Sequence, residues 1–105
     1  MYNSGTGATA INNDTVIKAE NGATGIYGNG GTITLTSGKK LEITVDDSSN
    51  PATKGLAVYA GNGSAINIQG ADISVKNGSA GVASFGTGSS INLNGAKLEY
   101  YGNGY

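Results

Sequence analysis

One short pattern occurs three times along this chain, and this repeat constrains the fold more than any single residue does. The pattern is an alternating run of polar and apolar residues built around an isoleucine: Thr32–Leu35, Ala65–Ile68 and Ser90–Leu93. A second alternating run follows each copy: Leu41–Ile43, Ile73–Val75 and Leu98–Tyr100. An aromatic residue precedes each copy: Tyr27, Tyr59 and Phe85. A fourth, degenerate copy comes before them and contains Ile11 and Ile17–Ala19.

The spacing between the copies is nearly constant. The two later copies of each run lie 25 residues apart, and Ile17 lies 24 residues before Leu41. The interval from Ile33 to Ile66 is 33 residues, because residues 46–53 are inserted after the second run of that copy. We expect this insertion to be a surface loop. A period in this range indicates stacked supersecondary units, none of which can bury its apolar face alone.

Each period contains three strand-like runs separated by corners rich in Gly and Asn. Alternation of β-branched with polar residues favours strands over helices, and Gly and Asn adopt positive φ at little cost. Three short strands in about 25 residues describe one coil of a parallel β-helix, and parallel crossovers are strongly biased to the right-handed form. The sequence predicts an all-β fold, a right-handed parallel β-helix of three to four coils spanning residues 1–105. An antiparallel sandwich with Asn-Gly hairpins is the alternative, but it does not explain the repeat.

Equivalent residues of successive coils are expected to form columns that run along the β-helix. One inward column holds Ile33, Ile66 and Ile91, and another holds Leu41, Ile73 and Leu98 with Ile17 below them. One outward column is expected to hold Lys18, Glu42, Ser74 and Glu99. The aromatic residues are expected to form a stacked column of their own, although which face of their strand points inward stays open.

The composition excludes several classes of function. The net charge is −1, which gives no electrostatic reason to expect a nucleic acid as partner. The chain lacks Cys, His and Arg, so it has no disulfide, no thiolate metal site and no neutral-pH base of the usual kind. No apolar run approaches the ~20 residues of a membrane-spanning helix. We therefore predict that the chain is not an enzyme, with no catalytic, cofactor-binding or metal-binding residue.

Four local features could serve as sites, but the residues favour a structural role for each of them. The run 5–10 matches a loose G-x-G-x-x-A pattern, but a dinucleotide site requires a preceding strand and a following helix. Asp46 and Asp47 with Ser48 and Asn50 form a possible weak ion site, while the other carboxylates are scattered over corners and outward positions. Ice binding would require a Thr column on every coil. Sugar binding through Tyr100, Tyr101 and Tyr105 is the fourth, and a structural role of the aromatic residues is favoured over it.

The chain resembles the passenger domains of Gram-negative autotransporter adhesins, above all the long Gly/Asn-rich ones of fusobacteria. The residues that carry the resemblance are the Gly25–Gly30 string, the Thr-Ile-Thr-Leu and Ile-Asn-Leu-Asn-Gly-Ala runs, and the absence of Cys. The resemblance implies a β-helical stalk that is exported through an outer-membrane barrel and displayed on the cell surface. It also implies attachment to a protein or glycan of a host cell or another bacterium.

These observations favour an adhesin segment that extends and presents a binding surface. The alternatives are a β-helical carbohydrate-active enzyme or phage-tail fragment, and a purely structural spacer without a ligand. We expect the chain to be a piece of a longer array. Open strand edges and apolar columns at both ends, with Ile17 and Ala19 at one and Leu98 and Tyr100 at the other, predict end-to-end self-association.

Overall fold

The computed structural model describes residues 1–47, 55–76 and 80–101, and these residues contain β-strands but no helix. The strands fall into successive triplets, each of which contributes one strand to each of three sheets. The bounds are β1 (Tyr2–Ser4), β2 (Ala8–Ile11), β3 (Thr15–Glu20), β4 (Thr24–Asn29), β5 (Thr32–Leu35), β6 (Leu41–Asp46), β7 (Leu56–Gly61), β8 (Ala65–Asn67), β9 (Asp72–Lys76), β10 (Ala80–Ser84), β11 (Ser90–Asn92) and β12 (Lys97–Tyr101).

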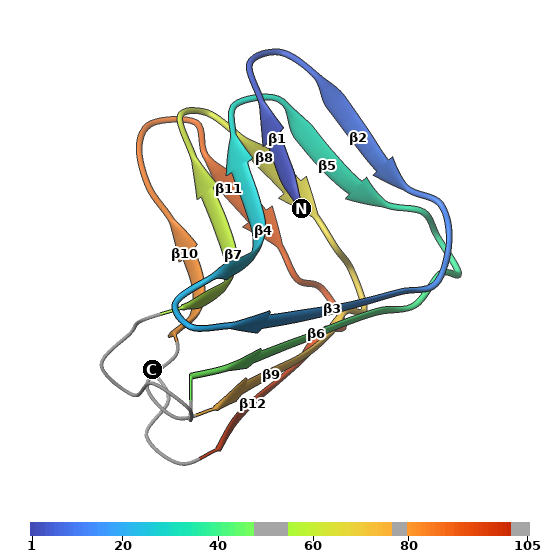
Figure 1. Ribbon diagram of the computed structural model, residues 1–105. Helices are drawn as coiled ribbons and strands as arrows, with labels where there is room; N and C mark the ends of the chain where they lie inside the picture. Colours follow the sequence, from blue (N-terminus) through green and yellow to red (C-terminus); the bar gives the residue numbers. More distant parts are fainter. Residues whose placement is uncertain (48–54, 77–79, 102–105) are drawn as a thin grey trace.

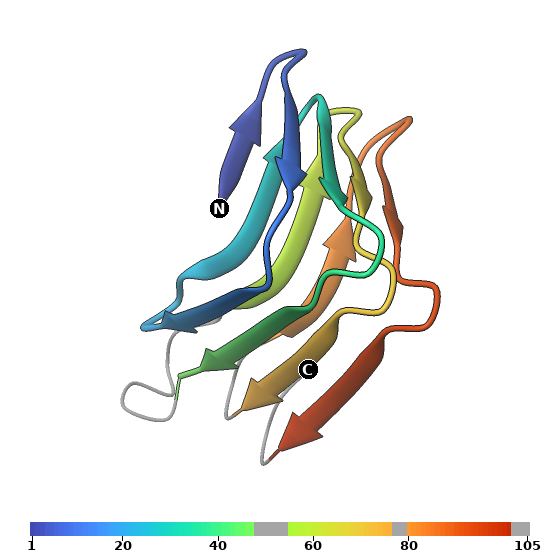
Figure 2. The same ribbon diagram turned by 90° about the vertical axis from the view of Figure 1, so that its right-hand side faces the viewer.

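The three sheets form the sides of a triangular solenoid (Figure 1). Sheet A has the order β1-β4-β7-β10, sheet B the order β2-β5-β8-β11 and sheet C the order β3-β6-β9-β12. Every neighbouring pair is parallel. The chain runs clockwise in Figure 1 while its later strands recede from the viewer, as the side view in Figure 2 shows, so the winding is right-handed. The predicted right-handed parallel β-helix is confirmed.

The core fills the interior of the triangle with columns of aliphatic side chains. Strand alternation creates these columns, because every second residue of each strand points inward. In sheet B, Ile33, Ile66 and Ile91 are in register as predicted, and the first two are at most 1% exposed. In sheet A, Ile26, Val58 and Val82 form the inward column. The face of these strands that carries the aromatic rings therefore points outward, a question that the sequence left open.

The register of sheet C differs from the prediction by two residues. Ile73 and Leu98 are in line with Ile43, not with Leu41, and Ile17 also aligns with Ile43. The cause is the corner before β6. Ten residues separate Ile33 from Ile43, whereas seven separate Ile66 from Ile73, so the corner in the second triplet is three residues longer.

The aromatic column has the same two-residue difference at its C-terminal end. Tyr59 is in register with Tyr27 and with Ala83, so Phe85 lies two residues past the expected position. Phe85 follows the end of β10, and its ring nevertheless reaches Tyr59, with a centroid distance of 5.6 Å. The prediction also omitted Tyr2, which extends the column at its other end.

Asn-Gly pairs form two of the corners, where they adopt positive φ as expected. Asn21 and Gly22 have φ of 56° and 82°, and Asn62 and Gly63 have φ of 53° and 79°. Side chains other than those of Asn and Asp are disfavoured in this region of φ, and Gly enters it without strain. These residues turn the chain between sheets within two or three residues.

The predicted insertion at residues 46–53 begins inside the solenoid. Asp46 is the last residue of β6, and Asp47 is completely buried. Residues 48–54 lie outside the described residues. Asp47 is inward because it continues the alternation of Leu41, Ile43 and Val45, all of which are buried.

Candidate functional site

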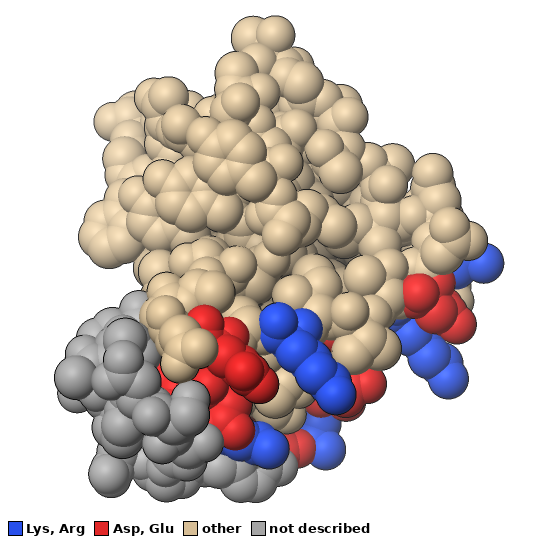
Figure 3. Space-filling model, viewed as in Figure 1, with Lys and Arg blue, Asp and Glu red and all other residues tan. Residues whose placement is uncertain are grey.

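Charged side chains are confined to one side of the solenoid. Among the described residues, sheet C and its flanking corners carry all the Lys, Asp and Glu side chains, and the strands of sheets A and B contain none. Figure 3 shows this separation on the face turned toward the viewer, where charge gathers over sheet C and its corners. The outer sides of sheets A and B, which we call the neutral face, are therefore the distinctive surface of the molecule.

Hydroxyl and amide groups line the part of the neutral face that belongs to sheet B. Thr34, Asn67 and Asn92 are in register and form one outward row. A second row after the ends of the strands lines a groove together with Thr34 and Asn67, and its members are Thr36, Gln69 and Asn94; Lys39 also lines this groove. We call the two rows together the amide–hydroxyl ladder.

Only part of the hydrogen-bonding capacity of this ladder is used within the described residues. The backbone N–H of Asn94 donates to Oδ1 of Asn92 at 3.0 Å, and the Thr36 hydroxyl donates to Oδ1 of Asn12. Oδ1 of Asn67 also has no hydrogen-bond partner there, but it is buried and not accessible to a partner. Because Asn and Gln each supply donors and acceptors, the ladder can bind a partner that carries hydroxyl or amide groups.

The outer side of sheet A carries a stack of aromatic rings. Tyr2, Tyr27, Tyr59 and Phe85 follow one another with centroid distances of 5.2, 4.8 and 5.6 Å and interplanar angles of 22°, 20° and 30°. Each inner ring has both faces covered by its neighbours, so only ring edges point outward along most of the stack. The expected structural column is thus confirmed, and open ring faces for sugar stacking occur only at its two ends.

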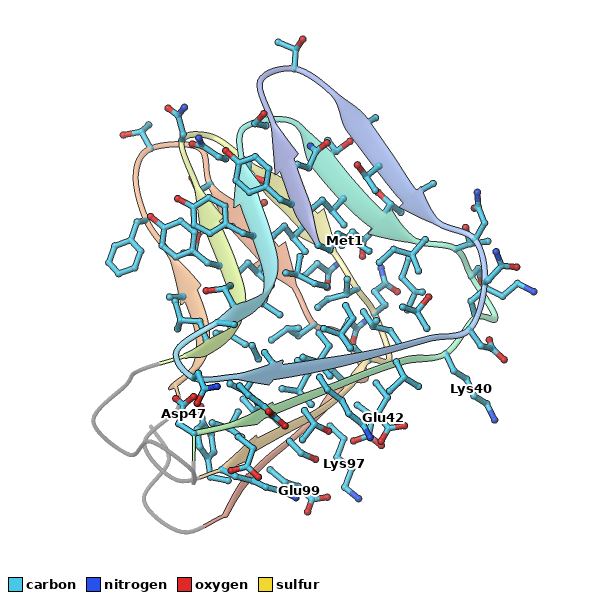
Figure 4. The ribbon with its side chains drawn as sticks, in the orientation of Figure 1. Met1, Lys40, Glu42, Asp47, Lys97 and Glu99 are labelled. Atoms are coloured by element: carbon cyan, nitrogen blue, oxygen red, sulfur yellow. The ribbon has the colours of Figure 1, made fainter. Side chains whose placement is uncertain are left out.

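The carboxylates of sheet C do not form the column that we expected from the sequence. Glu42 is in line with Asp72, and Lys97 continues that row, whereas Glu99 is in line with Ser74 and Thr44. The prediction that Glu42 and Glu99 share a column is wrong for the same reason as the Leu41 alignment. Lys97 Nζ lies 2.6 Å from Glu99 Oε1, and Figure 4 shows both side chains on the outer side of sheet C.

Asp47 is used by the backbone of two corners. Its Oδ1 accepts a hydrogen bond from the N–H of Gly22 at 2.9 Å, and its Oδ2 accepts one from the N–H of Gly55 at 2.8 Å. Figure 4 shows Asp47 at the corner between sheets C and A. The two bonds join successive triplets, which indicates a structural role. Ser48 and Asn50, the other members of the considered ion site, lie outside the described residues.

The described part of the chain holds neither a metal-binding cluster nor a dinucleotide-binding turn. No group of three or more His, Cys, Asp or Glu side chains there is arranged to hold a metal ion. The G-x-G-x-x-A run forms the corner between β1 and β2 and leads into a strand, so it lacks the helix N-terminus that a dinucleotide site requires. Residues 1–47, 55–76 and 80–101 contain no helix that could cross a membrane.

Comparison with models of known protein families, with known proteins and with solved structures gives no match for this chain. The fold is thus assigned from the geometry alone: a parallel β-solenoid. None of the three comparisons adds evidence for the resemblance to autotransporter passengers.

Proposed function

We propose that this chain is a segment of a β-helical surface adhesin, which extends and presents the neutral face to a partner on a host or bacterial cell. The observation that carries the proposal is the separation of charge: sheets A and B offer phenol, hydroxyl and amide groups without a single ionic side chain. Uncharged hydroxyl-rich partners such as glycans match these groups. The resemblance to fusobacterial autotransporter passengers supports the same assignment and implies a parent protein that is exported across the outer membrane to the cell surface.

The parallel solenoid suits an extending role for a physical reason. Each triplet hydrogen-bonds to the next through three sheets, so the chain presents a stiff surface whose rows repeat at the strand spacing of about 4.8 Å. A partner with repeating hydroxyl groups can contact several rows at once. Several weak contacts then add to a useful affinity, because multivalent attachment raises avidity without stronger individual contacts.

Adhesion of beads coated with the 105-residue chain tests the proposal, with cultured epithelial cells and bacterial cells as targets. Thr34→Lys places an ammonium group on the amide–hydroxyl ladder, and Thr44→Lys makes the same change on the outer side of sheet C as the matched control. We expect Thr34→Lys to reduce adhesion roughly tenfold, which corresponds to ~1.4 kcal/mol of binding free energy. We expect Thr44→Lys to leave adhesion unchanged.

Two outcomes would contradict the proposal. If wild-type beads adhere no better than uncoated beads to either cell type, the chain is a spacer. If both variants reduce adhesion equally, binding follows net charge and does not depend on the neutral face. Release of reducing sugar from polysaccharides by the same protein would instead support the carbohydrate-active alternative.

A further inference from the structure

The two ends of the solenoid differ in chemistry. The outermost strands are β1, β2 and β3 at one end and β10, β11 and β12 at the other. Each outermost strand pairs on one side only, and such edges are templates for pairing with another chain. The side chains at the two ends decide which pairing they favour.

At the end that contains β1, two polar residues join the apolar Ile11, Ile17 and Ala19 in the interior. Thr9 is in line with the fully buried Ile33, and Asn3 is in line with Gly28. The Thr9 hydroxyl donates to Oδ1 of Asn3 at 2.9 Å, and Nδ2 of Asn3 donates to the carbonyl oxygen of Gly7 at 3.1 Å. The first triplet thus ends its interior with a hydrogen-bonded pair.

Apolar columns are open at the end that contains β12. Leu98 and Tyr100 are 38% and 45% exposed, whereas Ile73 and Val75, which are in register with them in the preceding triplet, are fully buried. Phe85, the last ring of the aromatic stack, is 59% exposed. The same columns that form the core one triplet earlier reach solvent here.

We propose that, when the 105-residue chain is on its own, a second copy stacks its first triplet on the last triplet, so that β1, β2 and β3 of one molecule continue sheets A, B and C of the other. The register of the solenoid fixes what would meet. Ile17 of the added copy continues the column of Leu98, and its Ala19 continues that of Tyr100, so that a small side chain meets a large one. Tyr2 of the added copy falls in line with Ala83, two residues before Phe85, whose ring ends the aromatic stack.

Charge and polarity also match across this contact. Lys18 belongs to the outward column that holds Thr44, Ser74 and Glu99, so a stacked copy places its Lys18 beside Glu99. Asn3 likewise belongs to the inward column that ends in Ser84, through Gly28 and Ala60. The contact is head-to-tail, and such contacts propagate because neither molecule closes the assembly.

Sedimentation velocity over a concentration series tests the proposal with two variants that each block one end. Leu98→Lys places a charge in the open column of the last triplet, and Ile17→Lys does the same at the first triplet. The wild-type chain is expected to form a series of species that grows with concentration. Each variant alone is expected to be monomeric, and a 1:1 mixture is expected to form a heterodimer that grows no further, because each molecule contributes its one intact end.

Two results would overturn the proposal. One is a wild-type chain that stays monomeric throughout the concentration series. The other is an Ile17→Lys variant that still dimerises by itself while Leu98→Lys does not, because this pattern indicates a two-fold contact between two last triplets.

A charge exchange at the surface keeps the test valid if either lysine variant fails to fold. Glu99→Lys sets two lysines side by side in the stacked pair and is expected to weaken assembly, and adding Lys18→Glu is expected to restore it. Both positions point outward, so circular dichroism should show an unchanged fold. Failure of the double variant to restore assembly would also overturn the proposal, whereas the adhesion of single molecules to cells would not be affected.

Discussion

Asp47→Ala is predicted to destabilise the solenoid more than any other removal of a charge in its described part. The carboxylate is completely buried and accepts hydrogen bonds from the N–H groups of Gly22 and Gly55. Alanine removes both acceptors at once. A buried donor that is left without an acceptor costs about 1–3 kcal/mol, so the two donors together give about 2–6 kcal/mol. A domain of this length has a total stability of about 5–15 kcal/mol, of which this loss is a large fraction.

Urea unfolding followed by far-UV circular dichroism measures this loss, with the slope of the transition checked for two-state behaviour. Asp72→Ala is the matched control, because Asp72 is exposed on the outer side of sheet C. Its effect should stay within about 0.5 kcal/mol. Asp47→Asn should lie between the two, since the carboxamide keeps one acceptor oxygen and turns its NH₂ toward the other donor.

Amide hydrogen exchange gives a local measurement of the same interaction. The N–H groups of Gly22 and Gly55 should be protected in the wild-type protein and should lose that protection in Asp47→Ala. Equal stabilities of Asp47→Ala and Asp72→Ala would refute the reasoning. Unchanged protection of both glycines would do so as well, because it would mean that other acceptors hold the two corners.

Two further predictions concern close packing and the aromatic stack. Gly25→Ala should lower the free energy of unfolding by about 1–3 kcal/mol in urea, because the added Cβ would lie 2.7 Å from the carbonyl oxygen of Ala57. The control Gly7→Ala should change it little, because the nearest neighbour of its added Cβ lies at 3.4 Å. Equal effects of the two variants would contradict the packing argument. Tyr27→Leu removes two ring pairs and Tyr2→Leu removes one. At ~0.5–1.5 kcal/mol per pair, Tyr27→Leu should lower the free energy of unfolding, measured in thermal or urea melts, about twice as much as Tyr2→Leu. Equal losses would show that the stack adds nothing beyond buried area.

The fold could be predicted from the sequence because the repeat carries three kinds of information at once. The period gives the stacking, the alternation gives the strands, and the Asn-Gly corners give the turns. In sheet B all three agree, and Ile33, Ile66 and Ile91 lie in register as the spacing requires. The separation of charge between the sheets was also readable from the sequence once the strands were assigned to sheets, although no single motif announces it.

Two registers could not be predicted, and both differ from the structure by two residues. The sequence alignment placed Leu41 where Ile43 lies, and Phe85 where Ala83 lies. A slip of two residues keeps every inward side chain inward, because side chains alternate with a period of two along a strand. Aliphatic columns therefore tolerate such a slip, and the lengths of the corners decide between the alternatives.

Directional hydrogen bonds from inward polar residues fix the strand register, which the aliphatic columns do not fix. Asp47 continues the inward phase of β6, and its hydrogen bond from the N–H of Gly22 can form only when it lies beside that corner of the preceding coil. Asn3 and Thr9 bond to each other from sheets A and B, which fixes the first triplet in the same way. A polar residue that falls in phase with an apolar column is thus a register signal in a solenoid. Extending the alternation past Val45 would have placed Asp47 in the core before any coordinates were known.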